Sequence, residues 1–143
     1  MKKSITTLLI VSAFFSTGCI KTLFDKKKDT VEDLKTKYTG FWVSSKGAED
    51  ANGNGVVDAS EIQAINGSSD LNLDNNGTYT YSIRTNGNVF TMRGDWQVNT
   101  DGKSITITDP ANGSIRFDIK NDKEIHTEPI KSNGRTTWLI YNR

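Results

Sequence analysis

The stretch Thr78-Tyr79-Thr80-Tyr81-Ser82-Ile83 alternates polar and apolar side chains. A period of two is typical of a β-strand with one face in a core and the other in water, because successive side chains point to opposite faces. The same alternation returns further along the chain, over residues 90–98, 105–107, 115–119 and 138–141. The sequence therefore predicts an all-β fold built from short, half-buried strands.

Turn dipeptides separate these runs. They are Asn76-Gly77, Asn86-Gly87, Asp101-Gly102, Asn112-Gly113 and Asn133-Gly134, with Asn121-Asp122 in the same series. Asn, Asp and Gly tolerate the positive φ that tight hairpin turns require. Because the dipeptides stand about one strand and one turn apart, we expect each strand to pair with the next in an antiparallel meander.

Three further runs, residues 41–45, 69–73 and 125–130, bring the expected number of strands to about eight. A meander of that size has two exposed edges, which are aggregation hazards, unless it closes into a barrel. We therefore expect a closed barrel, with an open sandwich as the alternative that alternation alone does not exclude. A barrel of this size has room for packed side chains or for one small ligand.

The first 18 residues resemble a secretory signal peptide. Lys2 and Lys3 give it a positive start, residues 5–15 form a mostly apolar stretch, and residues 16–18 are small. The apolar stretch is too short to span a bilayer as a helix, so export is favoured over a transmembrane anchor.

Cys19 follows the small residues and is the only cysteine in the sequence, so it has no partner for an internal disulfide. Ser16-Thr17-Gly18-Cys19 resembles the lipobox of bacterial lipoproteins, although that family commonly has Leu where this chain has Ser16. The resemblance implies that Cys19 is acylated and holds the protein at a membrane. Ile20 is not the Asp that retains some lipoproteins at the inner membrane, so we expect the outer membrane, on its periplasmic or surface face.

Charge and organisation of the rest of the chain follow from this reading. Two lysines leave with the signal peptide, so 16 of the 18 basic residues remain against 17 acidic ones, a net charge of −1. This balance gives no reason to expect nucleic-acid binding. Residues 19–37 are expected to form a lipidated tether and a short helix, and residues 38–143 the barrel domain. The apolar face of the helix would carry Val31, Leu34 and Tyr38.

The segment Asp50-Ala51-Asn52-Gly53-Asn54-Gly55-Val56-Val57-Asp58-Ala59-Ser60-Glu61 matches the twelve-residue calcium loop of the EF-hand. Calcium prefers six to eight oxygen ligands at about 2.3–2.6 Å. The motif predicts Ca²⁺ as the bound cofactor. The predicted ligands are Asp50, Asn52, Asn54, the carbonyl of Val56, Asp58 and Glu61. Gly55 permits the sharp turn of such loops, and Val57 stands where they pack an apolar residue inward.

An Asn- and Gly-rich surface turn is the alternative interpretation of this segment. Chance alone would not also supply Val57 and Glu61 at the matching positions, so the calcium loop is favoured. The segment before it, residues 44–49, is too short for the usual entering helix, and we expect one or two helical turns over residues 59–65 after it. Without a second loop to pair with, it is expected to act as a structural staple.

Gly40-Phe41-Trp42 opens the strand series with a Gly-x-Trp motif, and Gly94-Asp95-Trp96 with residues 101–107 continues it. These motifs resemble the lipocalin-like domains of small bacterial lipoproteins over residues 38–143. The resemblance implies an eight-stranded barrel. The calcium loop is a departure, because this family does not generally carry one, and it would lie between the first two strands. The resemblance also implies that lipids or other small hydrophobic molecules are candidate ligands.

In lipocalins the tryptophan of this motif packs at the closed end of the barrel, with an arginine from near the chain end across it. The resemblance therefore assigns this position to Trp42, and either Arg135 or Arg143 would supply the arginine.

Together these features predict a membrane-anchored, calcium-binding lipoprotein. In it the metal orders a loop at the barrel mouth, and a small hydrophobic ligand is a candidate occupant of the barrel. The alternative is an envelope protein-interaction or inhibitor module with a packed, ligand-free barrel. The aromatic side chains expected to fill the core are Tyr79, Tyr81, Phe90, Trp96 and Phe117.

No catalysis is predicted. His126 is the only histidine in the sequence, and it lies between Glu124 and Glu128 without a nucleophile motif around it. We expect His126 to be a surface residue of a strand rather than a catalytic base.

Overall fold

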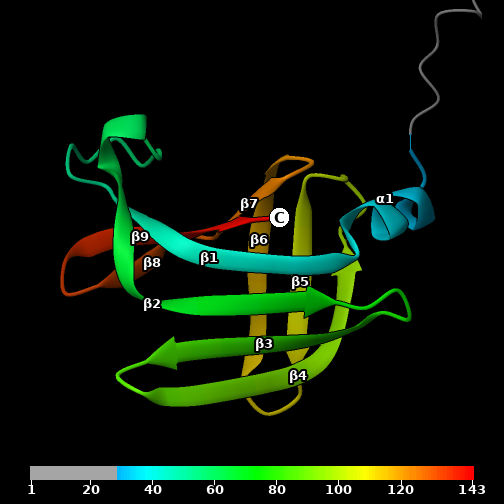
Figure 1. The fold of residues 1–143 in the computed structure, drawn as a ribbon. Helices are drawn as coiled ribbons and strands as arrows, with labels where there is room; N and C mark the ends of the chain where they lie inside the picture. The colour runs from blue at the N-terminus through cyan, green and yellow to red at the C-terminus, as the bar shows by residue number, and fades with distance from the viewer. Residues whose placement is uncertain (1–28) are drawn as a thin grey trace, which may run out of the picture.

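The computed structural model describes residues 29–143, so the predicted signal peptide (residues 1–18), Cys19 and the tether up to residue 28 lie outside the described residues. The described residues form helix α1 (Val31–Tyr38), the single 3₁₀ turn η2 (Ala59–Glu61) and nine strands (Figure 1). The strands are β1 (Gly40–Glu49), β2 (Ile62–Leu73), β3 (Thr78–Thr85), β4 (Asn88–Val98), β5 (Ser104–Asp109), β6 (Gly113–Asn121), β7 (Glu124–Thr127), β8 (Ile130–Ser132) and β9 (Arg135–Asn142). Within residues 29–143 we find no helix with the length and apolar character that crossing a bilayer requires.

The strands close into a ring. β1 to β7 pair in sequence order, β7 pairs with β9, and β9 pairs back to β1, all antiparallel. Eight strands therefore form a closed antiparallel barrel, and β8 pairs only with β9. The predicted meander and its closure are confirmed, and the open sandwich is excluded. The first and last strands of the barrel, β1 and β9, are therefore neighbours.

Two of the predicted hairpin turns have the expected backbone. Asn86 and Gly87 join β3 to β4 with φ of 49° and 78°, and Asn133 and Gly134 join β8 to β9 with φ of 50° and 76°. Positive φ at both central residues is the signature of the type I′ turn, whose twist matches that of the flanking strands. Because a register is set by its turn, these two dipeptides fix the pairing of both hairpins.

The predicted strand over residues 125–130 is wrong, because it is broken in two. β7 and β8 lie along the same edge of β9, but their registers differ. Pro129 stands in the gap and has no N–H to give to the ladder. The backbone N–H of Leu139 donates instead to Oγ1 of Thr127, at 2.9 Å.

The predicted helical exit over residues 59–65 is also wrong beyond its first turn. η2 ends at Glu61, and β2 starts at Ile62 and pairs with β1 through Ala48. Sheet pairing with β1 gives these residues backbone hydrogen-bond partners, whereas an isolated helix of one or two turns is only marginally stable in water.

The core fills the inside of the barrel, where Tyr79, Tyr81, Trp96 and Phe117 are buried as predicted. Phe90 was expected to join them, but 60% of it is exposed. It pairs with Ile83 at the far end of β3 and β4, beyond the last complete layer of the core. The alternation placed Phe90 on the correct face and could not show where the core ends.

Helix α1 covers the closed end of the barrel. Thr30 is its N-cap: Oγ1 of Thr30 accepts from the N–H of Asp33 at 3.1 Å, and the N–H of Thr30 donates back to Oδ2 of Asp33 at 2.9 Å. This capping box satisfies two N–H groups at the helix start. Leu34 and Tyr38 pack against the core, whereas Val31 is exposed.

Arg143 is the arginine that lies across Trp42. Its guanidinium carbon is 4.7 Å from the centre of the Trp42 ring, which is completely buried. Nε of Arg143 donates to the carbonyl of Asp122 at 2.9 Å, and Nη1 to that of Thr39 at 3.2 Å. Arg135 lies elsewhere and bonds Glu49 at 3.4 Å.

Candidate metal loop and open-end groove

The predicted calcium loop lies at the end of β1 and β2 that is farthest from α1 (Figure 1). Val57 packs against Ala48, Trp138 and Ile140, which form a small apolar cluster of their own. Leu139 and Tyr141 contact the core inside the barrel, so Trp138 and Ile140, which alternate with them, lie on its outer face. Val57 therefore packs against apolar side chains as predicted, but these side chains lie on the outer face of the barrel wall and not in its core.

The carboxylates of the loop accept hydrogen bonds from the loop backbone. Oδ2 of Asp50 accepts from the N–H of Gly55 at 3.0 Å. Oε1 of Glu61 accepts from the N–H of Ala51 at 2.9 Å, and Oε2 from that of Asp58 at 3.2 Å. Glu61 thus reaches back across the loop and joins its first and last turns.

Two asparagine amides converge on the third carboxylate. Nδ2 of Asn52 and Nδ2 of Asn54 donate to the same oxygen, Oδ2 of Asp58, at 2.7 and 2.9 Å. Their own oxygens accept from the loop backbone, at the N–H groups of Asn54 and Val56. Four of the five predicted side-chain ligands, Asn52, Asn54, Asp58 and Glu61, are therefore joined in one hydrogen-bonded network, while Asp50 bonds the loop backbone at Gly55.

The donor chemistry of this network fits calcium, which binds carboxylate, amide and carbonyl oxygens. Oδ1 of Asp50 is buried and has no hydrogen-bond partner among the described residues. A buried carboxylate oxygen without a donor is costly, and a cation would satisfy it. Across residues 29–143, however, we find no three acidic, histidine or cysteine side chains gathered into a ready-made metal cage. The ligands would have to turn toward a cation from their present hydrogen bonds.

A second candidate site lies at the open end of the barrel and was not predicted from the sequence. Residues 65–68 of β2 face a single residue of β1, Ser45, so β2 bulges there. The bulge borders a groove of about 250 Å³, whose walls also include Ile83 and Leu139. The groove reaches Ser69, which is buried. Residues 50–61 are not part of its wall, and the expectation that a metal orders this loop at the barrel mouth stays a prediction.

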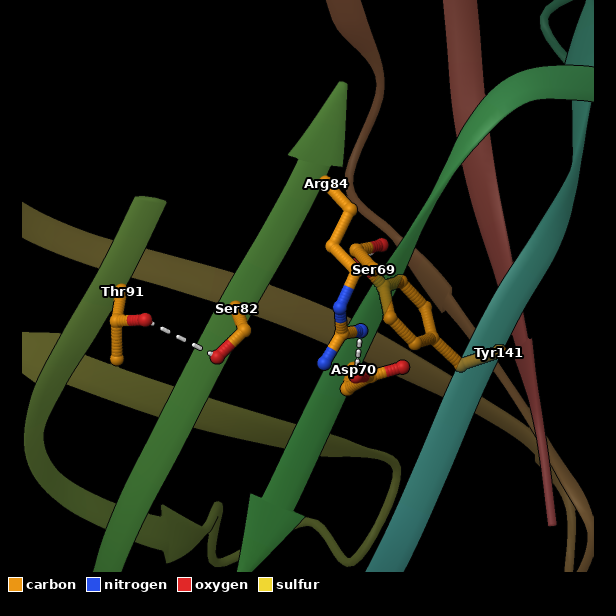
Figure 2. A network of polar contacts seen from close by, with 6 residues as sticks. All are labelled: Ser69, Asp70, Ser82, Arg84, Thr91 and Tyr141. Atoms are coloured by element: carbon orange, nitrogen blue, oxygen red, sulfur yellow. Dashed lines mark hydrogen bonds and ion pairs between the residues drawn. The ribbon is translucent and has the colours of Figure 1, made fainter. Parts of the chain in front are cut away.

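Three hydroxyl groups meet below this groove. Oγ of Ser69 is 2.6 Å from Oη of Tyr141, which is 2.8 Å from Oη of Tyr81. Their residues are 2%, 0% and 3% exposed, respectively. Burial, and then the nearby Tyr81, raise the pKa of the Tyr141 hydroxyl far above its ordinary value, so it stays protonated. Figure 2 shows Ser69 and Tyr141 side by side, next to the ion pair of Asp70 and Arg84.

His126 is buried rather than on the surface, and only 5% of it is exposed. It lies opposite Ile140 of β9, and its Nε2 is 2.8 Å from Oε1 of Glu124. Its Nδ1 is buried and has no hydrogen-bond partner among the described residues. The surface position expected for His126 is therefore wrong, since its strand lies between Asp118 of β6 and Ile140 of β9 and its side chain is buried there.

Comparisons with known proteins give only distant similarities. No protein-family model matches the sequence, and no curated protein is similar to it. A redesigned β-barrel of solved structure has 12% sequence identity and a TM-score of 0.43, and the match covers 77% of this chain and 94% of that one. Insecticyanin from the tobacco hornworm Manduca sexta has 12% identity and a TM-score of 0.41, over 75% of this chain and 61% of that one. The architecture of this chain therefore rests on its own strand pairings.

Proposed function

We propose that this protein is a membrane-anchored, non-catalytic calcium-binding barrel, in which Ca²⁺ holds the loop of residues 50–61 in place. One observation carries the proposal: Oδ1 of Asp50 is buried without a partner in a loop that has an oxygen donor at every EF-hand ligand position. A divalent cation would satisfy this oxygen and would neutralise its repulsion with Asp58 and Glu61.

Binding would exchange hydrogen bonds for metal bonds. The amides of Asn52 and Asn54 now point their Nδ2 atoms at Asp58, so rotation of each amide would bring its oxygen to the same place. Glu61 already spans the loop through its bonds to the N–H groups of Ala51 and Asp58. Extracellular calcium modules bind at about 10⁻⁴–10⁻³ M, so millimolar calcium would add about 1.4 kcal/mol at tenfold excess over the dissociation constant. That energy orders a loop but does not hold a domain together.

Calorimetric titration of the full-length chain with calcium chloride tests the proposal. We expect saturable heat for the wild type, and at least about tenfold weaker binding for Asp50→Ala, which removes two candidate metal oxygens. Asp101→Ala is the matched control, because Asp101 accepts a backbone N–H in a turn outside the loop. Absence of heat at millimolar calcium, or equal binding by both variants, would contradict the calcium site.

The membrane anchor is proposed from the sequence alone, because Cys19 lies outside the described residues. Acylation at Cys19 would leave residues 20–28 and α1 between the lipid and the barrel. Metabolic labelling with palmitate, compared between wild type and Cys19→Ser, tests it. Fractionation of the envelope then tests the proposed outer-membrane location.

The open-end groove favours a second function, binding of a small, mostly apolar molecule. Ile65, Ile83 and Leu139 give it apolar walls, and its volume of about 250 Å³ exceeds the roughly 150 Å³ cavity that is known to take benzene. The neutral fluorescent probe N-phenyl-1-naphthylamine, added to the full-length Cys19→Ser chain, which cannot be acylated, should bind saturably. Without such binding, the packed core supports the alternative, an envelope protein-interaction or inhibitor module.

A further inference from the structure

The buried hydroxyl cluster of Ser69, Tyr81 and Tyr141 has three hydrogen-bond donors but only two hydrogen bonds among its members. Each hydroxyl can donate one hydrogen bond, and the two contacts within the cluster use two of the three donors. None of the three has a further hydrogen-bond acceptor among the described residues. One buried O–H therefore lacks an acceptor, and buried polar groups in folded proteins nearly always have a partner.

The shape of the groove decides which hydroxyl carries the free proton. Ser69 lines the groove, whereas Tyr81 and Tyr141 are enclosed by the core. If Tyr81 donates to Tyr141 and Tyr141 donates to Ser69, the free proton is on Ser69 and faces the groove. The other two arrangements would leave the free proton on Tyr81 or on Tyr141 inside the core, where an unpaired donor is costly.

We propose that the groove binds a small apolar molecule whose head is an uncharged oxygen acceptor, such as a ketone, ester or amide carbonyl, held by the hydroxyl of Ser69. This inference rests on the second function proposed above and names the class of its ligand. Ile65, Ile83 and Leu139 would contact the apolar body, and the Ser69 hydroxyl would orient the head.

A carboxylate head is disfavoured by the charges around the groove. A buried anion needs a cation or several donors beside it, and the cluster offers one neutral O–H. Arg84 borders the groove, but its guanidinium is already paired with Asp70. The hydroxyls add no charge that could balance a carboxylate, because a protonated hydroxyl is neutral and Tyr141 stays protonated. The site therefore selects against fatty-acid anions of the same length.

Matched ligands test this selectivity. We would displace N-phenyl-1-naphthylamine from the full-length Cys19→Ser chain at pH 8 with 2-octanone, with octanoate and with n-octane. We expect 2-octanone to bind at least about tenfold more tightly than octanoate, because only octanoate buries a charge. It should also bind about threefold to tenfold more tightly than n-octane, which is the range of one hydrogen bond.

Substitutions in the hydroxyl cluster test which of its hydroxyl groups binds the ligand. Ser69→Ala should remove the advantage of 2-octanone over n-octane, because the free donor no longer reaches the groove. Tyr81→Phe should keep that advantage, because Tyr141 can still donate to Ser69. Ser82→Ala is the matched control, since this hydroxyl lies on the outer face of β3 and contacts Thr91 (Figure 2).

The possible results fall into three groups. Selectivity for 2-octanone that depends on Ser69 supports the proposal. Equal binding of all three displacing ligands would overturn it, would indicate that water supplies the acceptor, and would leave the apolar site intact. If the probe itself does not bind, the ligand-binding function fails, and this inference fails with it.

Discussion

Replacing Arg143 with alanine tests how the closed end of the barrel is held together. The guanidinium covers the ring of Trp42 at 4.7 Å and donates to the carbonyls of Asp122 and Thr39. An exposed cation–π contact contributes about 0.5–1 kcal/mol, and each hydrogen bond about 0.5–1.5 kcal/mol. Because Arg143 is itself partly solvated, we take the lower part of the summed range, about 2 kcal/mol. For a domain of this size that corresponds to a fall of about 8 °C in Tm.

Arg135→Ala provides the matched comparison. Arg135 makes one long contact with Glu49, at 3.4 Å, and 70% of its side chain is exposed. Exposed ion pairs contribute little, so its Tm should change by less than about 2 °C. Thermal unfolding of wild type and both variants, followed by circular dichroism in one buffer, measures the difference. Equal Tm values for the two variants would refute the assignment of Arg143 as the residue that holds the closed end.

Two further predictions concern the outer wall and the hydroxyl cluster. Val57→Ala should destabilise the protein by about 1 kcal/mol and shift the fluorescence emission of Trp138 to longer wavelength, because Val57 packs on the cluster that contains Trp138. Val56 is exposed, so Val56→Ala should have neither effect. The free energy of unfolding, measured with urea, should fall as the pH rises above about 10. Tyrosines of the unfolded chain ionise there, while burial holds the pKa of Tyr141 higher in the folded protein, so the unfolded state binds fewer protons. Tyr141→Phe should reduce that slope, and an unchanged slope would contradict the assignment.

Local patterns predicted most of the fold because the information lies within a few residues. The alternation around Tyr79 and Tyr81 gives both the strand and its buried face. Asn86-Gly87 gives a turn of the observed type, because only a few residues accept positive φ at both positions. Closure also followed, since an unclosed meander leaves two edges unpaired.

One error had a local cause, and two others arose where another segment of the chain decides the structure. The strand expected over residues 125–130 breaks at Pro129, and a proline inside a strand run was an available signal for that break. The exit of the calcium loop became β2 because β1 offered it a pairing edge. His126 is buried because it lies against the outer face near Ile140, which no local pattern around it reveals.

The two candidate sites differ in the same way. The calcium loop is contiguous, so its spacing alone located every ligand position from Asp50 to Glu61. Its attachment to the outer wall depends on Trp138, far along the chain, and could not be predicted. The hydroxyl cluster joins Ser69 to Tyr141 across 72 residues and Tyr81 to Tyr141 across 60. Only the closed barrel brings these hydroxyls together.

The pairing of β1 with β9 also governs the order in which the molecule can fold. β1 starts at Gly40 and its partner begins only at Arg135, so a growing chain holds two uncompleted sheet edges until β9 has been made. Contacts of such long sequence separation form slowly, since loop closure must precede them. A chain cut before β9 would keep both edges open and would be prone to self-association, so loss of the last strand harms solubility more than its share of the core suggests.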